Sequence, residues 1–349
     1  RETTVGILLG SMPPSAKKRI RDMLADRSID IVIGTHALIQ DQVNIPKLAL
    51  AVIDEQHRFG VLQRAALREH GNNPHMLIMS ATPIPRTLAL TLYGDLDLST
   101  IDQLPPGRQA VKTWWLQPEH RRRIYTFIRK QIADGRQVFV VYPLIDESEE
   151  VNARAAINER ERLANDVFPD LRIGLIHGRM SLKEKQAVMD GFHNRELDIL
   201  VSTPVVEVGI DVPNATIMLI EGADRFGLSQ LHQFRGRVGR SQHSSYCFLL
   251  AESPSEEAKQ RLSAMELIED GFELAEKDLS LRGPGEYFGT RQSGLPDLRM
   301  AKLTDSNLLT LARKEAQNIL ENDPHLVAKE HLQLKKSLDH FTSSIGEVG

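Results

Sequence analysis

The chain has 349 residues, of which 41% are hydrophobic and 26% are charged, and its formal net charge is -4 at pH 7. This composition is that of an ordinary globular protein, and the length suggests two or three domains. The negative net charge excludes a generally basic nucleic-acid coat protein, so contact with nucleic acid must come from local basic patches.

The single cysteine, Cys247, excludes a disulfide framework and a cysteine-rich metal site, which fits a reducing cytoplasm. Its apolar neighbours predict that it is a small buried core residue. No apolar run approaches the roughly 18 residues that a membrane span requires. The chain starts at Arg1 without an initiator methionine or a signal-peptide pattern, so we expect it to begin inside a longer protein.

Helical and strand patterns alternate in the first part of the chain. Residues 11–27 predict a helix, because prolines are tolerated in its first turn and its apolar residues form one stripe. Strands are predicted at residues 29–33, 48–53 and 76–79. This alternation is typical of βαβ units and of a mostly parallel sheet.

The most informative stretch in this part is LALAVIDEQHRFG, residues 48–60. Its apolar run predicts a strand that is buried on both faces. The run ends in Asp54 and Glu55, followed by Gln56 and His57, and the carboxyl ends of such strands are where open α/β sheets bind ligands. In nucleotide hydrolases one such Asp holds Mg²⁺ and its neighbour positions the attacking water. The alternative is a core strand that continues into a charged surface loop.

A second α/β series follows a linker. Residues 93–111 are rich in Gly, Pro and Asp and predict the edge of a lobe plus a linker. A helix is predicted over residues 119–134, ended by Gly135, and a capping box of Ser181 and Glu184 opens a helix that runs to residue 192. Strands are predicted at residues 138–142, 172–176, 199–201, 217–220 and 246–250.

The remainder of the chain has a different character. Ser253, Pro254 and Glu256 predict the start of a helix that runs to about residue 270. Residues 281–300 are glycine-rich and match neither the helix nor the strand period. From residue 305 onward we expect two amphipathic helices, interrupted near residues 323–324.

The stretch QLHQFRGRVGR, residues 230–240, interleaves Gln233, Arg237 and Arg240 with Gly236 and Gly239. The glycines allow a tight turn that brings guanidinium groups to a phosphate, with which arginine pairs in a bidentate manner. The alternative is a basic surface loop.

In combination these stretches resemble the superfamily-two helicases over nearly the whole chain. Asp54, Glu55, Gln56 and His57 resemble motif II; Ser80, Ala81 and Thr82 resemble motif III; residues 233–240 resemble motif VI. Three motifs in this order are far more specific than each motif alone.

Longer stretches narrow the resemblance to the RecG family. They are GTHALIQ, IDEQHRFGVLQR, SATPIPRTLALTLYGDLDLS, IDQLPPGR and LRGPGEYFGTRQSG. The resemblance implies an ATP-dependent motor that translocates on double-stranded DNA and remodels stalled replication forks and Holliday junctions in repair and recombination. The transcription-repair coupling factor shares several of these stretches, but Gln56 and His57 together with LPPGR favour RecG.

The resemblance also implies roles for single residues. Asp54 would hold Mg²⁺, Glu55 would orient or activate the water, and Gln56 and His57 would couple the nucleotide state to motif III. Arg237 and Arg240, with Gln233 alongside, would reach the phosphates of ATP. Glu207, Gly209 and Asp211 resemble motif V, which faces both DNA and nucleotide. Positions implied to serve coupling or DNA contact are Gly34, Thr35, His36, Ser80, Ala81, Thr82, His177, Gly178, Ser202 and Thr203.

Residues 261–299 resemble the translocation motif of RecG, a helical hairpin followed by a glycine-rich loop. Arg261, Arg282, Arg291 and Gln292 match positions that the family uses to tie the hairpin to ATP turnover. For His177 the alternative of a strand-end histidine that bonds only to backbone stays open.

Two features depart from the family pattern. Pro204 stands where the family usually has a second threonine, and proline lacks the N–H that could contact a phosphate. The sequence contains no GxxxxGK[ST] phosphate loop, and we find no N-terminal wedge domain of the OB type. We therefore expect a fragment that is inactive in isolation.

The sequence thus predicts an α/β protein with two RecA-like lobes, the first incomplete, and a C-terminal helical hairpin or translocation element. The predicted domains are residues 1–110, 111–252 and 253–349. The expected cofactors are ATP and Mg²⁺, and the expected partners are branched DNA and single-stranded DNA-binding protein. We expect a monomer in the bacterial cytoplasm, associated with the nucleoid. The alternatives are the translocase module of a transcription-repair coupling factor and a non-catalytic DNA-binding remnant.

Overall fold

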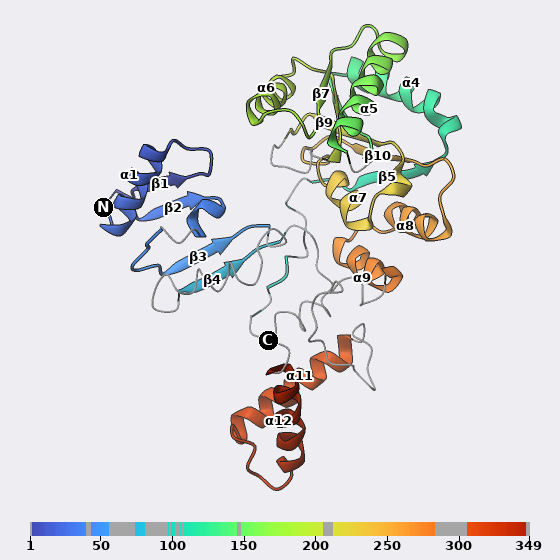
Figure 1. Ribbon diagram of the computed structural model, residues 1–349. Coiled ribbons are helices and arrows are strands. Elements are labelled where there is room, and N and C mark those ends of the chain that lie inside the picture. Colours follow the sequence, from blue (N-terminus) through green and yellow to red (C-terminus); the bar gives the residue numbers. More distant parts are fainter. Residues whose placement is uncertain are drawn as a thin grey trace. The chain divides into compact units, whose positions relative to one another are not determined.

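The computed structural model describes residues 2–39, 43–55, 74–80, 97, 99–101, 103, 105, 108–144, 148–204, 212–282 and 306–346. The chain forms two compact units, Arg1–Thr82 and Pro83–Gly349, and each is described by itself (Figure 1). In the described part of the chain, no helix is long and apolar enough to cross a membrane.

The first unit contains two pairs of parallel strands. The pairs are β1 (Val5–Leu8) with β2 (Ile31–Gly34), and β3 (Leu50–Ile53) with β4 (His75–Ile78). The helix α1 (Pro14–Ala25) connects β1 to β2, and a 3-10 turn, η1 (His36–Ile39), follows β2. Leu8, Leu24, Ala37 and Val43 form the buried core of this unit. The predicted helix and strands are therefore present, although β1 was not predicted.

The burial of β3 differs from the prediction. Ala51 and Ile53 are buried, but Leu50 is 54% exposed and Val52 is 53% exposed. Successive side chains of a strand point to opposite faces of a sheet, so one face of β3 is covered and the other is not. The prediction that this strand is buried on both faces is wrong, because an apolar run reports the composition of a strand and not what covers each face.

The second unit is built on a six-stranded sheet with the order β5-β10-β9-β6-β8-β7, in which every pair is parallel. The strands are β5 (Val111–Leu116), β6 (Gln137–Val141), β7 (Ile173–Ile176), β8 (Ile199–Ser202), β9 (Ala215–Ile220) and β10 (Ser245–Leu250). The α-helices between and after them are α4 (Arg121–Ala133), α5 (Glu149–Arg162), α6 (Leu182–His193), α7 (Leu228–Arg235), α8 (Glu256–Leu267) and α9 (Gly271–Arg282). Short helical turns are η3 (Pro118–His120), η4 (Leu163–Val167) and η6 (Ala223–Arg225).

Helices cover both faces of this sheet. One core joins α4 and η4 to the sheet and contains Ile124, Ile128 and Leu163. The other core joins α6, α7, α8 and α9 to the opposite face and contains Phe192, Phe234, Met265 and Leu274. All described side chains of β6, β8 and β9 are buried, as is usual for strands between two helical layers. Cys247 belongs to the second core and is fully buried, as predicted, and burial raises the pKa of its thiol to about 12.

The helix ends in this unit follow the predicted capping residues. Gly135 has φ 80, and Arg136 N donates to Gln131 O while Gly135 N donates to Ile132 O, which is a Schellman motif at the end of α4. Ser181 N donates to Glu184 Oε2 over 2.7 Å and Glu184 N donates to Ser181 Oγ over 3.3 Å. These bonds confirm the predicted capping box at the start of α6.

Three elements of the second unit did not follow the sequence patterns. β5 begins at Val111, where a linker was expected, and its Trp114 stacks on Phe248 of β10 with ring centroids 5.5 Å apart. The N-cap of α8 is Ser255 and not Ser253, since Ser255 Oγ accepts from Ala258 N. α5 was not predicted, because its charged sequence carries little apolar periodicity.

The last two helices are α11 (Ser306–Asn322) and α12 (Leu332–Gly346), as predicted from their amphipathic pattern. The turn between them is fixed by Asp323, whose carboxylate accepts from Val327 N and Ala328 N over 2.9 Å each and lies 2.8 Å from His331 Nδ1. These bonds lower the pKa of Asp323 to about 2, and the bond from Val327 N has the largest effect.

Candidate functional sites

Asp54 and Glu55 follow directly after β3, as predicted. Asp54 Oδ1 accepts a hydrogen bond from Glu55 N over 2.8 Å. Glu55 has φ 50, in the left-handed region that non-glycine residues rarely adopt. Such strained backbone often occurs at functional sites, where the surrounding structure enforces it.

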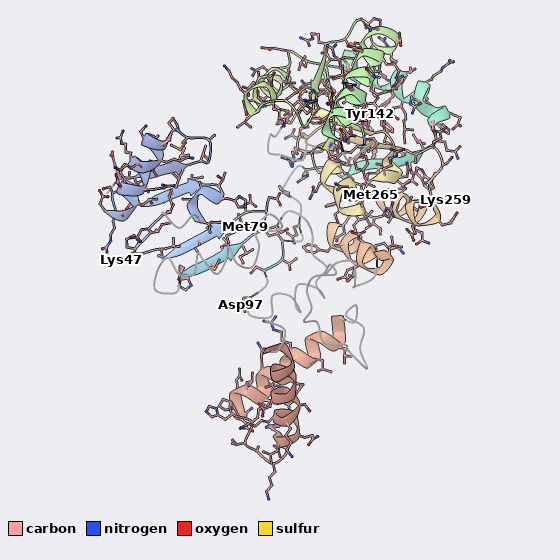
Figure 2. All side chains as sticks on the ribbon, viewed as in Figure 1. Lys47, Met79, Asp97, Tyr142, Lys259 and Met265 are labelled. Carbon is pink, nitrogen blue, oxygen red and sulfur yellow. The ribbon has the colours of Figure 1, made fainter. Side chains whose placement is uncertain are left out.

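Ser80 lies at the end of the neighbouring strand. Met79 N donates to Ile53 O over 2.8 Å, so the residues that follow β3 and β4 start from adjacent strand ends (Met79 is labelled in Figure 2). The structure therefore brings Asp54 and Ser80 to one edge of the strand pair. The predicted partners Gln56, His57, Ala81 and Thr82 lie outside the described residues.

Gly34, Thr35 and His36 form the passage from β2 into η1. A Cβ atom on Gly34 would lie 2.3 Å from Leu8 O, so only glycine fits this close approach of the two strands. Thr35 O accepts from Leu38 N over 2.9 Å and thereby starts the turn. The close approach of β1 and β2 therefore explains why a glycine stands at position 34. Thr35 is the first residue after β2.

His177 and Thr203 lie at neighbouring strand ends in the second unit. Thr203 N donates to Ile176 O over 3.3 Å, which places Thr203 beside the start of the loop that contains His177 and Gly178. Thr203 is 2% exposed, and neither its Oγ1 nor the buried Nδ1 of His177 has a hydrogen-bond partner among the described residues. Burial, with the charges of Lys185 and Arg179, lowers the pKa of His177. Among the described residues, no backbone group satisfies Nδ1 of His177, which speaks against the alternative of a histidine that bonds only to backbone.

Ser202 and Pro204 flank Thr203. Ser202 is fully buried and donates from Oγ to Thr203 O over 2.6 Å. Pro204 is described, but Glu207, Gly209 and Asp211 lie outside the described residues.

The arginine-rich stretch starts in α7 and continues into a tight turn. Gln233 lies in the last turn of α7, and Arg240 is exposed and donates from Nε to Gly236 O over 3.0 Å. Gly239 has φ 77, and a Cβ atom there would lie 2.7 Å from Val111 Cγ2. Gly236 has the ordinary helical φ of -68, so only Gly239 needs the conformational freedom that was predicted for both glycines.

Arg235, two residues before Arg237, is a buried arginine that the sequence reasoning did not single out. It is 6% exposed, and its guanidinium donates to Met265 O, Ile268 O and Glu269 O at the end of α8 and also contacts His232 Nδ1. The sequence contained a sign of this burial. Leu228, Leu231 and Arg235 recur at helical spacing and so share the buried face of α7.

Two further polar contacts join α8 and α9 to the rest of the second unit. Arg261 of α8 donates to Asp224 O in η6 over 3.0 Å. Ser229 of α7 donates to Asp278 of α9 over 3.2 Å, and Asp278 is 1% exposed. The expected hairpin is therefore bonded to the helix that leads into the arginine-rich turn. Arg282 ends α9, its side chain is not described, and Arg291 and Gln292 lie outside the described residues.

The described ranges contain no cluster of three or more His, Cys, Asp or Glu side chains arranged to bind a metal ion. Asp54 is the predicted magnesium ligand, and its side chain is exposed at the end of β3. A single carboxylate at such a position is one of the few protein ligands that Mg²⁺ takes when phosphates and waters complete its shell.

Family models match three segments of the chain. Residues 3–91 match the DEAD/DEAH box helicase, residues 119–242 the helicase conserved C-terminal domain, and residues 268–344 domain 3, C-terminal, of the ATP-dependent DNA helicase RecG. The three matches follow the chain in the order of the predicted motifs.

Individual relatives agree with these models. The ATP-dependent DNA helicase RecG of Synechocystis sp. is 52% identical over 95% of this chain and 40% of its own length. The protein of the same name from Aquifex aeolicus is 51% identical over 96% of this chain and 43% of its own length. A solved structure of RecG bound to a three-way DNA junction matches with a TM-score of 0.67 and 46% identity, covering 88% of this chain and 40% of that chain.

The chain therefore spans less than half of the length of these relatives. The fold agrees with the prediction of RecA-like α/β lobes, since the parallel sheets and their helices match the solved RecG structure. We conclude that this chain is a homologue of the RecG helicases over nearly its whole length.

Proposed function

We propose that this chain is the motor portion of an ATP-dependent translocase and helicase on double-stranded DNA. In this proposal it remodels stalled replication forks and Holliday junctions by branch migration and fork regression, in DNA repair and recombination. The observation that carries the proposal is the match, at 46% identity over 88% of this chain, to RecG bound to a three-way DNA junction.

The residues present fit the use of ATP with Mg²⁺. The exposed carboxylate of Asp54 would hold the ion, and Glu55, held next to it, would orient the attacking water. Bound Mg²⁺ neutralises charge on the phosphates of a nucleotide. Arg237 and Arg240 would bind phosphate with guanidinium groups, which pair with phosphate in a bidentate manner and stay protonated.

The contacts of α7 with α8 and α9 support a coupling role for the hairpin. Arg235 lies two residues before Arg237 and bonds to three carbonyl groups at the end of α8. A movement of the arginine-rich turn on nucleotide binding would therefore be transmitted to the hairpin through a fixed polar contact. We keep residues 1–110, 111–252 and 253–349 as the proposed domains, the third being bonded to the second.

We further propose that this protein acts as a monomer at the bacterial nucleoid. Its proposed partners are branched DNA and single-stranded DNA-binding protein. The second candidate is the translocase module of a transcription-repair coupling factor, which the shared GTH and ATPIPRT stretches support. A non-catalytic remnant is the third, and the presence of Asp54, Glu55, Arg237 and Arg240 speaks against it.

A chimaera provides the test. This chain replaces the matching 332 residues of the Synechocystis sp. relative, to which it is 52% identical. We expect the chimaera to hydrolyse ATP when a three-way DNA junction is added and to unwind that junction. Glu55→Gln in the chimaera should reduce ATP turnover by about 100-fold or more while nucleotide binding is kept, because a positioned general base typically contributes about 10²–10⁴ in rate.

The exposed Glu161→Gln is the matched control, since it makes the same change of charge away from the site. A folded chimaera that binds the junction but shows no ATP turnover would contradict the proposal. The chain alone is expected to show no appreciable DNA-stimulated ATPase, because its sequence contains no GxxxxGK[ST] stretch, and such activity would contradict this expectation.

A further inference from the structure

Among the described strands, β5 forms one edge of the six-stranded sheet, and it carries an exposed tryptophan. Its neighbour in the sheet is β10. Trp114 of β5 pairs in register with Phe248 of β10, and Lys112 pairs with Tyr246. Residues in register on adjacent strands point to the same face of a sheet, so these four side chains lie on one face. Trp114 is 36% exposed there.

The aromatic rings on this face form a stack. The indole of Trp114 lies 5.5 Å from the ring of Phe248 and 6.1 Å from that of Tyr246, centroid to centroid, with interplanar angles of 16° and 15°. Nearly parallel rings at these distances are offset-stacked, because coplanar rings so close would collide. Both partners belong to β10, so they cover the face of the indole that is turned toward the sheet. The other face of the indole is turned to the sheet edge.

The helix α4 supports this stack and adds positive charge beside it. Phe127 of α4 meets the two β10 rings in T-shaped contacts, with centroids 4.9 and 5.7 Å away. Arg123 and Lys130 lie four residues before and three residues after Phe127, so they share its side of the helix. Both are exposed, as is Lys112. None of these three cations forms an ion pair with an acidic side chain of the described residues.

The backbone edge of β5 is partly occupied by side chains of the same unit. Trp115 N donates to Glu266 Oε1 over 3.4 Å, and Val111 O accepts from Thr113 Oγ1 over 3.2 Å. Occupied edge groups disfavour the pairing on which addition of a peptide strand depends. An open indole face beside exposed cations instead suits a nucleic-acid base and its phosphates, since aromatic stacking and positive charge are the two features of single-strand binding sites.

We propose that Trp114, with Lys112, Arg123 and Lys130 around it, forms a stacking site for a base of single-stranded DNA. The three cations would contact the phosphates on either side of that base. The site lies at the opposite edge of the sheet from β7 and β8, which lead into positions assigned above to DNA contact. The choice of DNA rests on the proposed function, because unwinding of a junction exposes single strands of DNA.

Tryptophan fluorescence tests the inference, because Trp114 and Trp115 are the two tryptophans of the chain. Trp115 packs against the core on the other face of the sheet and is therefore the matched control. The probe is an oligothymidylate of about eight nucleotides, which is within the usual range of single-strand site sizes. Trp115→Phe leaves Trp114 as the fluorophore, and this variant should lose most of its emission when the probe is added. Trp114→Phe should keep nearly all of its emission.

The salt dependence of the quenching gives a second readout, measured in the Trp115→Phe variant. Lys112→Gln, Arg123→Gln and Lys130→Gln should each weaken binding of the probe. Each should also reduce the slope of log affinity against log salt by about 0.7, as for the loss of one phosphate contact with a single strand. Lys183→Gln removes the same charge from an exposed position of α6 and should change neither the affinity nor the slope.

Several results would overturn the inference. They are an unquenched Trp114, equal quenching by an abasic strand of the same length, and equal quenching by an oligoglutamate, which would assign the surface to acidic peptides. Stronger quenching by an oligouridylate would overturn the choice of DNA. If the chimaera unwinds the junction while Trp114 is not quenched, the inference alone fails. If Trp114 is quenched as expected while the chimaera does not unwind the junction, the proposed function fails and the stacking site stands on its own titration.

Discussion

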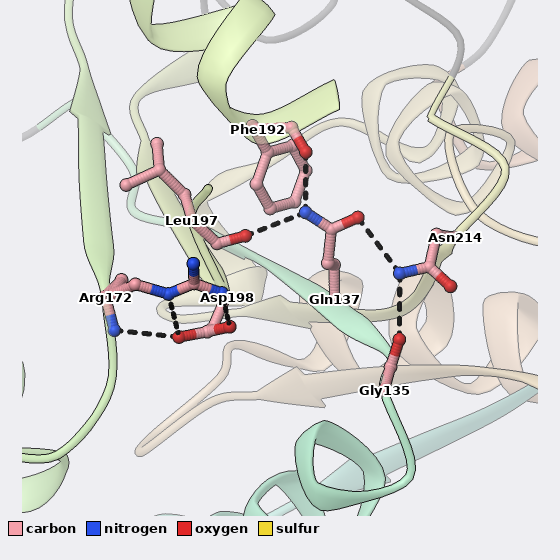
Figure 3. Close-up of polar contacts among 7 residues, drawn as sticks. All are labelled: Gly135, Gln137, Arg172, Phe192, Leu197, Asp198 and Asn214. Carbon is pink, nitrogen blue, oxygen red and sulfur yellow. Dashed lines mark hydrogen bonds and ion pairs between the residues drawn. The ribbon is translucent and has the colours of Figure 1, made fainter. Parts of the chain in front are cut away.

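Asn214 donates a hydrogen bond from Nδ2 to Gln137 Oε1 over 3.1 Å, between two side chains that are 8% and 3% exposed (Figure 3). Gln137 Nε2 donates to Phe192 O and Leu197 O, and Asn214 Nδ2 also donates to Gly135 O. The two amides thereby join the starts of β6 and β9 to the turn that follows α6. Buried polar groups are tolerated at such a place because each has a partner.

Replacement of Gln137 by leucine should lower the free energy of unfolding by about 2–4 kcal/mol, because three hydrogen bonds at a buried place are lost. Leu197 O loses the donor described for it, Phe192 O keeps only Arg195 N as a described donor, and Asn214 Nδ2 loses one acceptor. Urea unfolding followed by circular dichroism measures this change. Gln186→Leu is the control, since Gln186 is exposed and its side chain donates to Asp190, and it should cost less than about 0.5 kcal/mol. Equal effects of the two substitutions would refute the structural role of Gln137.

The two glycines of the arginine-rich turn should respond differently to alanine. Gly239→Ala forces a φ of 77 on an alanine and brings its Cβ within 2.7 Å of Val111, so we expect a loss of about 1–3 kcal/mol in stability. Gly236→Ala meets its nearest atom at an ordinary 3.4 Å and should be close to neutral. Thermal unfolding of both variants decides the point, and a larger loss for Gly236→Ala would contradict the described turn.

Arg195 occupies a helix-terminal position that glycine would fill with less strain. Its φ is 61, and Glu196 N donates to Gly191 O, as in a Schellman motif. Arg195→Gly should therefore raise the free energy of unfolding by up to about 1 kcal/mol, because a left-handed backbone is costly for residues with a Cβ. Gly135→Ala, with φ 80 and open space around it, is the reverse control and should destabilise. A drop in the melting temperature of Arg195→Gly would oppose this reasoning.

The neutral state of His232 should make stability depend on pH. Burial first, then the charge of Arg235, lowers the pKa of His232 to about 4. Nδ1 lies 3.1 Å from Arg235 NH2, and because a guanidinium can only donate, Nδ1 must accept and the ring proton must be on Nε2. Between pH 6.5 and 4 the unfolded chain binds a proton that the folded chain does not, so stability falls as the pH is lowered through this window.

The contribution of His232 can be isolated with His232→Gln, which removes the titration. The stability difference between the unmodified chain and this variant should change by at most about 1.4 kcal/mol per pH unit below pH 6.5 and should be constant above it. Urea titrations at several pH values measure the difference. A difference that does not vary with pH would show that His232 is not held neutral by the fold.

The sequence by itself determined most of the local structure of this protein. Apolar runs located the strands that end just before Asp54 and Thr203, and short-range capping chemistry located the helix ends at Gly135 and Ser181. These features depend on residues within a few positions of each other, so a single chain segment contains the information. The motifs also indicated the family, because several of them occur in a fixed order.

Only the tertiary structure decided what covers each element and which distant residues meet. The exposed face of β3, the strand at Val111 and the carbonyl partners of Arg235 depend on contacts with residues far away in the sequence. Packing and hydrogen bonding between remote segments are set by the folded arrangement, and local patterns do not record them.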